Sequence, residues 1–276
     1  MATGESQLYS AEHDPRPSVV GDGTGDYVQV DAWGVAREAA GSADTVGTLT
    51  AWVLIKSQSD SYSILSAGDT SAIEYINFQI VNGLLNITLA DGGAVAFDIE
   101  ADGDLVPINE WTHIAVVQDG VQPRLYKNGV RVTATNDVST NLTKWFTDLN
   151  GIDNANIGIL DQNTSTTLDI DGAIGEVKHY NAALTEAEVL LDFQGKRQSA
   201  ATAALLISHW KWDGDLLDSV AGHNGTVVGN LYQDIQRSNL TAYIEAQAWV
   251  LGDEVVMAVT PGSNGRNVVH FLRIEA

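Results

Sequence analysis

The sequence predicts an all-β protein, with most of the chain in one antiparallel β-sandwich. Between residues 21 and 180, short runs with alternating apolar side chains are separated by turns rich in Gly, Asn and Asp. Asn-Gly at 82–83 and 128–129 and Asp-Gly at 91–92 and 119–120 supply the positive φ angles that tight hairpins need. The runs recur at intervals of roughly 8–12 residues, a spacing typical of sandwiches.

Each predicted strand is a short apolar run between two such turns. The strands are expected at 27–30, 49–55, 62–65, 76–80, 84–89, 94–99, 113–117, 124–126, 130–132, 155–159 and 176–180. One surface helix is expected at 185–193, because Thr185 can cap its first turn, acidic residues follow, and Gly195 can end it. A second helical signal, at 36–41, is too short to predict a helix.

The remaining sequence divides the chain further. Residues 1–20 are polar and contain two prolines, which predicts an extended arm, and residues 196–204 form a low-complexity linker. The sandwich is expected to span 21–230. The C-terminal part, 237–276, reads as a β extension, with strands expected at 242–250, 254–260 and 268–274.

Charge and composition exclude several classes of function. The chain has 36 acidic and 14 basic residues, a formal net charge of −22, so nucleic-acid binding is not expected. It has no cysteine, which excludes disulfides and thiol chemistry. No apolar stretch approaches the ~18 residues of a membrane span, and no export signal precedes the first strand, so membrane insertion is not expected.

Several motifs in the expected order resemble one known family. Glu110-Trp111-Thr-His113-Ile-Ala-Val-Val117, then Asp119-Gly120, then Arg124-Leu-Tyr126-Lys-Asn128-Gly129 form the most specific run. The segments 23–30, 49–53 and 171–185 match in the same order. Over about 20–195, the chain resembles the laminin-G-like jelly roll of the concanavalin A-like lectin/glucanase superfamily. The resemblance implies a jelly-roll sandwich and a binding function.

One motif stands out of place. Trp210-Lys-Trp212-Asp213-Gly214 and the turns that follow it resemble the strand that usually opens this domain, but here they follow the closing strand. The simplest interpretation is a circularly permuted sheet that residues 205–230 complete. The alternative is that this strand exchanges into a neighbouring subunit.

No catalytic site is expected. The related glucanases use alternating acids on one strand, and the nearest match here, Asp98-Ile-Glu100-Ala-Asp102, has them in a different order. A solvated strand face explains these acids better. The six histidines form no metal or nucleophile motif.

A structural Ca²⁺ is one hypothesis, because jelly rolls of this type often hold one at the sheet rim. Carboxylate and amide oxygens are the ligands that Ca²⁺ prefers. The candidate ligands are Asp213, Asp218 and Asn224 in a turn-rich segment, with Asp171 and Glu176 on the partner strand. The alternative is that the Asp and Asn side chains cap turns.

Loop aromatics are the candidate ligand-binding residues. Trp145 and Phe146 follow Asn141 in a predicted loop, and Trp33 follows Asp31. Aromatic rings beside Asn and Asp are typical of sugar-binding sites. The alternative, which we weigh equally, is that the loop packs its own hydrophobic residues beneath itself.

Three functions follow from the resemblance. The first and favoured one is a non-catalytic structural or adhesive surface subunit of a larger assembly, such as a phage virion decoration or fibre protein. Its expected partners are other protein subunits, including copies of itself, and surface glycans, and its expected location is a virion or an extracellular surface. The second is a free carbohydrate-binding lectin module. A glycoside hydrolase is a distant third.

Overall fold

The computed structural model describes residues 17–40 and 43–234 and the two strands β19 (Glu254–Pro261) and β20 (Asn267–Ile274). The chain forms two compact units, Met1–Asp234 and Ile235–Ala276. In the second unit, β19 and β20 pair as an antiparallel hairpin, so the strands predicted at 254–260 and 268–274 are confirmed. The strand expected at 242–250 and the arm at residues 1–16 lie outside the described residues.

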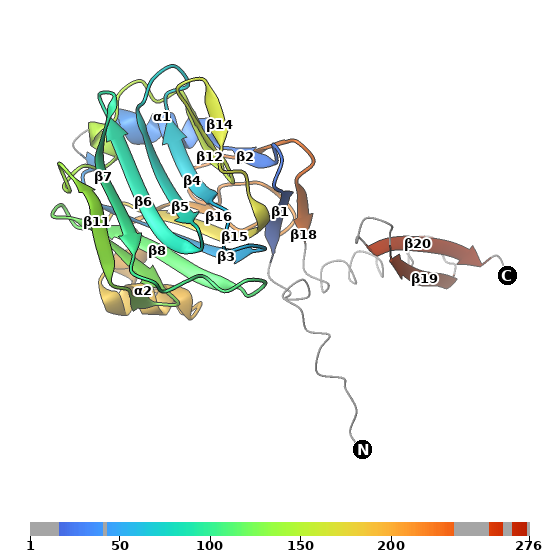
Figure 1. Ribbon diagram of the computed structural model, residues 1–276. Coiled ribbons are helices and arrows are strands. Elements are labelled where there is room, and N and C mark those ends of the chain that lie inside the picture. The colour runs from blue at the N-terminus through green and yellow to red at the C-terminus, as the bar shows by residue number, and fades with distance from the viewer. Residues whose placement is uncertain (1–16, 41–42, 235–253, 262–266, 275–276) are drawn as a thin grey trace. The chain divides into compact units, whose positions relative to one another are not determined.

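The first unit is built from two antiparallel sheets of eight strands each (Figure 1). Sheet A runs in the order β10 (Val130–Arg131), β9 (Pro123–Lys127), β8 (Thr112–Gln118), β3 (Gly47–Ile55), β15 (Asp171–Tyr180), β1 (Ser18–Asp22) and β18 (Tyr232–Asp234), and β16 (Leu206–Trp210) also pairs with β15. Sheet B runs in the order β11 (Ala134–Ser139), β7 (Ala94–Ala101), β6 (Leu84–Asp91), β5 (Tyr75–Val81), β4 (Tyr62–Gly68), β12 (Asn154–Ile157), β2 (Tyr27–Gln29) and β17 (Thr226–Val228). A separate hairpin joins β13 (Leu160–Gln162) to β14 (Ser165–Thr167). The predicted jelly-roll sandwich is confirmed.

The core lies between the inner faces of the two sheets. On β5, Ile76, Phe78 and Ile80 are buried in it, and they alternate with polar residues that point to the opposite face. Burying each such side chain contributes about 1.5–3 kcal/mol, so this alternation fixes which face of each strand is turned inward. The hairpin from β5 to β6 turns at Asn82 and Gly83, both at positive φ (48° and 80°), as the Asn-Gly pair predicts.

Residues 206–234 contribute strands to both sheets within the same chain. β16 pairs with β15 beside the end of β1, β17 pairs with β2 at the edge of sheet B, and β18 pairs with β1 at the edge of sheet A. Both tryptophans of the displaced motif are fully buried: Trp210 Nε1 donates to the carbonyl of His223, and Trp212 Nε1 donates to that of Gly175. The tryptophans of the motif are therefore part of the core of this unit.

The observed helices agree only in part with those predicted from the sequence. Helix α2 (Glu186–Phe193) is confirmed, with Thr185 as its cap and Gly195 at positive φ after it. Helix α1 (Asp31–Ala39) was not predicted; Trp33, within it, is buried in the core, so tertiary packing stabilises a segment whose own helical signal is short. Helix α3 (Ala200–Ala203) lies in the segment expected to be a linker.

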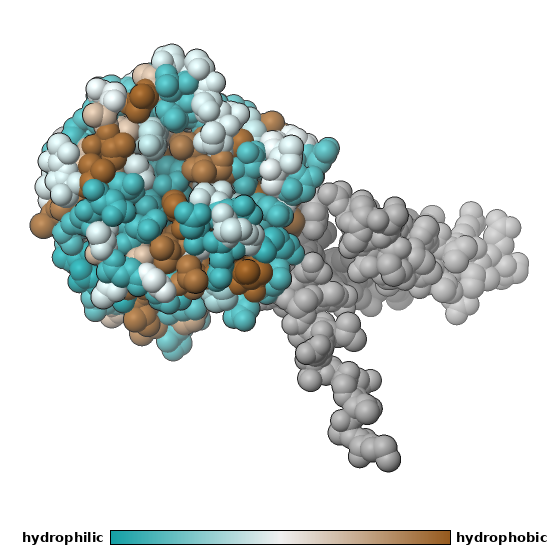
Figure 2. All heavy atoms as spheres, in the orientation of Figure 1, coloured by the Kyte–Doolittle hydropathy of each residue, from teal (hydrophilic) through white to brown (hydrophobic). Residues whose placement is uncertain are grey.

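The surface carries scattered apolar residues. The exposed large ones lie on many different elements, and Figure 2 shows hydrophobic patches set among hydrophilic residues on the face in view. No helix in the described part of the chain is long and apolar enough to cross a membrane.

Candidate functional site

The aromatic residues proposed to bind ligand are in the core. Trp33 and Trp145 are 0% exposed and Phe146 is 1% exposed, and the Phe146 ring packs edge-on against both tryptophans, with centroids 5.2 and 5.1 Å away. The expectation that the Trp145–Phe146 loop presents its rings to solvent is wrong, and the alternative of a loop that packs its own hydrophobic residues inward is correct. Asn141 is exposed, and its Oδ1 accepts hydrogen bonds from the backbone N–H and Oγ1 of Thr143. It therefore caps a turn.

Two of the proposed calcium ligands also cap turns. Oδ1 of Asp218 accepts from the backbone N–H groups of His209 (2.9 Å) and Val220 (3.0 Å). Oδ1 of Asn224 accepts from the N–H of Asp218 (3.1 Å). These oxygens satisfy the local backbone, as the alternative expectation has it.

The other three do not complete a cation site. Glu176 binds the side chains of His209 and Lys178, Asp171 lies in β15 opposite Asp22, and Asp213 is exposed. Among the described residues, no group of three or more His, Asp or Glu side chains is arranged to hold a metal ion. The five residues do not fit a calcium site here, and calcium binding stays a prediction from the resemblance.

A buried charged cluster lies where helix α2 covers the outer face of sheet A. Asp192 of α2, 4% exposed, accepts hydrogen bonds from four side chains of sheet A. The donors are Thr50 Oγ1 (2.8 Å), His113 Nε2 (3.2 Å), Lys178 Nζ (3.0 Å) and Tyr180 OH (3.0 Å). Burial raises the pKa of Asp192, but the hydrogen bond from His113 and the charge of Lys178 outweigh it and hold that pKa below its usual range. We call these residues the Asp192 cluster, and it attaches α2 to sheet A.

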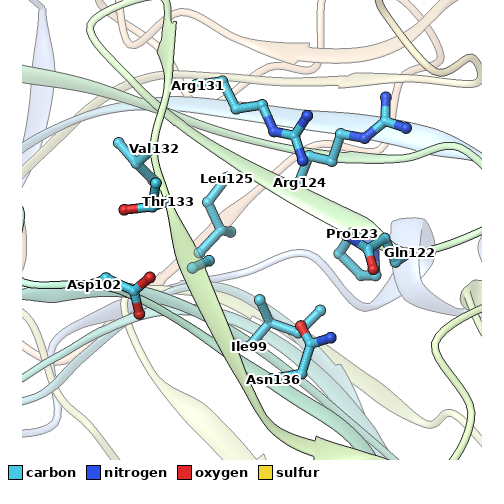
Figure 3. A pocket seen from close by; sticks show the side chains of 11 residues that line it. Ile99, Asp102, Gln122, Pro123, Arg124, Leu125, Arg131, Val132, Thr133 and Asn136 are labelled. Atoms are coloured by element: carbon cyan, nitrogen blue, oxygen red, sulfur yellow. The ribbon is translucent and has the colours of Figure 1, made fainter.

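A pocket of about 550 Å³ opens at one edge of the sandwich, where β9 and β10 of sheet A meet β7 and β11 of sheet B (Figure 3). Core residues Ile99 and Leu125, each 1% exposed, form part of its lining. The lining has no aromatic residue, and one of its two arginines, Arg124, is paired with Asp119. The pocket is a gap between sheet edges, and its lining also includes the polar residues Asp102, Arg131 and Asn136.

The outer face of sheet B, turned away from the core, carries two rows of polar side chains. The strand register places neighbours in each row directly opposite one another. One row is Asn156, Ser66, Asn77, Thr88 and Asp98, and the other is Ser63, Gln79, Asn86 and Glu100. We call these nine residues the polar face. In Figure 1, strands β4–β7 are seen with no helix drawn over them.

A directed chain of hydrogen bonds crosses the polar face. Ser63 Oγ donates to Asn77 Oδ1 (2.7 Å), and Asn77 Nδ2 donates to Gln79 Oε1 (2.6 Å). Gln79 Nε2 donates to Asn86 Oδ1 (2.9 Å), and Asn86 Nδ2 donates to Asp98 Oδ1 (2.8 Å). Every donor points toward Asp98, so each bond polarises the next. We call this chain the Asp98 relay.

The relay ends on a carboxylate that has acceptor capacity left. Thr88 Oγ1 also donates to Asp98 Oδ1 (3.0 Å), whereas Oδ2 of Asp98 accepts no hydrogen bond from the described residues. Asp98 and Glu100 are half-buried, while the inner members of the relay are buried. The buried amides therefore fix the orientation of a carboxylate whose second oxygen is not used by the protein.

One border of the polar face is formed by the chain around the β13–β14 hairpin. Ser66 Oγ donates to the carbonyl of Ile159 (2.7 Å), and the backbone N–H of Ser63 donates to that of Leu168 (2.8 Å). The carbonyl oxygen of Asp161 lies 2.7 Å from the position of a Cβ at Gly68. This close approach along β4 gives the polar face a wall on that side.

The polar face is rich in negative charge. Burial and the charges of Asp137 and Asp98 raise the pKa of Glu100. Burial and the charge of Asp98 raise the pKa of Tyr75, which lies beside the row on β5. None of the nine residues is basic, so ionised groups on this face are carboxylates.

The sequence reasoning missed this face. It considered Asp98 and Glu100 as catalytic or as solvated, whereas the structure places them half-buried on one face of β7. Asp102 lies beyond the strand and accepts from Thr135 Oγ1 (2.7 Å). The signal that could have found the face is the use of Ser, Asn, Gln and Thr, rather than Lys or Glu, at the outward positions of the strands over 62–90.

Solved structures with this fold include carbohydrate-binding proteins. The CBM40 module of the Ruminococcus gnavus IT-sialidase, solved bound to alpha2,3 sialyllactose, matches with a TM-score of 0.54 and 18% identity, over 64% of this chain and 96% of that one. A heptameric SAP-like pentraxin from Limulus polyphemus matches with a TM-score of 0.50 and 13% identity, over 80% of this chain and 96% of that one. At these identities, the likeness shows the fold.

The family follows from the sequence match. No curated protein matches the chain. The laminin-G family described as the concanavalin A-like lectin/glucanases superfamily matches residues 22–190, more than half of the chain. The chain therefore belongs to this laminin-G family of the concanavalin A-like lectin/glucanases superfamily.

Proposed function

We propose that this chain is a glycan-binding module and that the polar face of sheet B is its binding surface. The observation that carries the proposal is the Asp98 relay, which orients a half-buried carboxylate and leaves one of its oxygens without a protein donor. The family supports a lectin-like role, and so does the fold of the sialyllactose-bound module from Ruminococcus gnavus. The free lectin module is thus better supported than a virion subunit.

The chemistry of the face suits sugar hydroxyls. A carboxylate oxygen accepts charge-assisted hydrogen bonds, which are shorter and stronger than neutral ones. Glu100 lies two residues along the same strand and faces the same side, so adjacent hydroxyls of one sugar ring can meet both carboxylates. Half-buried Tyr75, on the neighbouring strand, offers part of a ring for the apolar side of the sugar.

We expect binding without hydrolysis. Glycoside hydrolysis needs one carboxyl group that protonates the leaving group and a second that attacks or activates water. Asp98 is held as an acceptor by donors from Asn86 and Thr88, and the order of acids on β7 departs from that of the related glucanases. Release of reducing sugar from a β-glucan, abolished by Glu100→Gln, would contradict this expectation.

A role in a larger assembly is a second candidate. The observation that favours it is the separate unit 235–276, which lies beyond the residues that match the family and contains its own β-hairpin. In a virion or at a cell surface, this unit would attach the module to other subunits. The solution mass of the full chain tests it, since a strict monomer at all concentrations contradicts self-assembly.

A glycan array tests the main proposal directly. Wild-type chain, Asp98→Asn and Glu186→Gln are applied to the same array. Asp98→Asn removes the charge of the relay acceptor, and Glu186→Gln removes one exposed carboxylate on α2, which covers the other sheet. We expect wild type and Glu186→Gln to share the same bound glycans and Asp98→Asn to lose them. No bound glycan, or equal binding by all three, would contradict the proposal.

A further inference from the structure

The charges around the polar face point to the kind of glycan it takes. Resting on the proposed function, we infer that the polar face selects glycans by charge: it rejects glycans that carry carboxylate or sulfate, accepts neutral ones, and binds those with a protonated amine most tightly. Its ligand would then differ in kind from the acidic sugar in the Ruminococcus gnavus module.

Negative charge lies at the end of the polar face near β7 and β11. Asp98 and Glu100 are on the face itself, and Asp137 of the edge strand β11 is exposed and close enough to raise the pKa of Glu100. A ligand that uses the open oxygen of Asp98 lies beside Glu100, which faces the same side of β7, and near the charge of Asp137. A ligand carboxylate placed there would meet like charges in a partly desolvated site.

The opposite end of the polar face also carries negative charge. Asp161, on the hairpin that borders the face, has a pKa raised by burial and by the charges of Asp153 and Asp31. Tyr27, at the start of β2, has a pKa raised by burial and by the charges of Asp161 and Asp31. A longer glycan lying along the rows would therefore meet carboxylates at both ends.

Two basic side chains near the edges of this sheet are paired with acids of their own. Lys144 binds Asp91 at the end of β6, and Asp148 and Glu74 are also close enough to raise the pKa of Lys144. Arg124, which lines the pocket at the β7–β11 edge, is paired with Asp119. Arginine and lysine are the side chains best suited to bind an anionic sugar, and the nine residues of the polar face include neither.

The size of the effect follows from Coulomb's law. With the effective dielectric constant of about 20 that describes partly buried sites, two like charges about 6 Å apart change a binding constant by roughly tenfold to a hundredfold. Salt screens such interactions over about 10 Å at moderate ionic strength. The preference for amines over acids should therefore shrink as salt is raised.

An array sorted by glycan charge tests the inference. Neutral glycans, such as lactose and chito-oligosaccharides, are compared with sialyllactose, sulfated glycans and glucosamine oligomers, at low and high ionic strength. We expect glucosamine oligomers to bind more tightly than matched N-acetylated ones, and sialylated or sulfated forms to bind at least about tenfold more weakly than their neutral parents. Preferential binding of sialylated glycans, lost in Asp98→Asn, would overturn the inference and leave the glycan-binding proposal intact. Absence of all glycan binding would overturn both.

A charge reversal beside the face sharpens the test. Asp137→Lys places a cation next to Glu100 without altering any residue of the polar face, and Glu186→Lys makes the same change on α2. We expect Asp137→Lys to reduce the ratio of neutral to sialylated binding severalfold and Glu186→Lys to leave it unchanged. Equal ratios in both variants and wild type would contradict selection by local charge.

Discussion

The two outer faces of the sandwich each carry a polar network that ends on an aspartate, and the two networks are used differently. On sheet A, the Asp192 cluster is covered by α2, and four donors from three strands and both oxygens of Asp192 are engaged. On sheet B, the Asp98 relay is made of uncharged groups up to its last member. Among the described residues, the donors to Asp98 are Asn86 and Thr88, which both bind its Oδ1 and leave Oδ2 open.

The difference shows how the position of a carboxylate decides its role. A carboxylate buried between a helix and a sheet must be paired with a cation and hydrogen-bond donors, because an unpaired buried charge is costly. A half-buried carboxylate at the surface can be oriented by neutral amides and still have an acceptor free for a ligand. We therefore expect the Asp192 cluster to act in stability and propose that the Asp98 relay acts in binding.

The largest expected effect is on the covered face. Asp192→Asn removes the charge that pairs with Lys178 and that accepts a hydrogen bond from His113, and we expect it to lower the free energy of unfolding by about 3–5 kcal/mol. Denaturant unfolding monitored by tryptophan fluorescence measures it. A loss below about 1 kcal/mol would show that the cluster does not hold α2 in place.

The same substitution of Asp by Asn on the polar face should affect binding strongly and stability weakly. We expect Asp98→Asn to weaken glycan binding by about 10- to 100-fold, the loss of a charge-assisted hydrogen bond, and to change the free energy of unfolding by less than about 1.5 kcal/mol. Calorimetric titration with the best glycan, together with denaturant unfolding, gives both values. If Asp98→Asn lowered the free energy of unfolding as much as Asp192→Asn, the relay would be a structural network.

Acid should change the folding stability in opposite directions through the carboxylates of the two faces. Burial raises the pKa of Glu176, but the hydrogen bond from His209 and the charge of Lys178 lower it from 4.5 to about 2. Its stabilising effect is therefore complete above its unfolded pKa and is lost as pH falls from about 4.5 toward 2. Glu100 has a raised pKa, so the folded state binds its proton more tightly and protonation of this group favours folding.

Melting temperatures measured between neutral pH and pH ~3 test whether Glu176 and Glu100 change stability in opposite directions. We expect Glu176→Gln to flatten the acid loss of stability and Glu100→Gln to steepen it relative to wild type. The same change in slope for both variants would contradict the assignment of opposite environments.

The smallest effect is expected at the start of the relay. Ser63→Ala removes the donor to Asn77 and leaves the rest of the chain of bonds in place. We expect a loss of about 1 kcal/mol in stability and a loss of glycan affinity below about fivefold. A larger affinity loss than that of Asp98→Asn would contradict a relay that ends at Asp98.

Local sequence patterns predicted the strands. Contacts between segments that are distant in the sequence determined the features that those patterns could not predict. Alternation over 76–80 and 84–89 fixed which side chains enter the core, and Asn82-Gly83 fixed the turn between them. The same alternation contains the polar face, but its register across five strands depends on pairing that a single strand does not encode. Trp33 and Trp145 looked like loop residues because the core that buries them comes from both sheets.

The most direct test of binding at the polar face is nuclear magnetic resonance during titration with a glycan that the array identifies. The side-chain amides of Asn77, Gln79 and Asn86 give distinct signals, and they form the relay that leads to Asp98. We predict that these signals and the backbone amides of β5–β7 shift first and most. Shifts confined to the pocket around Ile99 and Leu125, or to the turns of 211–225, with the three side-chain amides unchanged, would contradict the account.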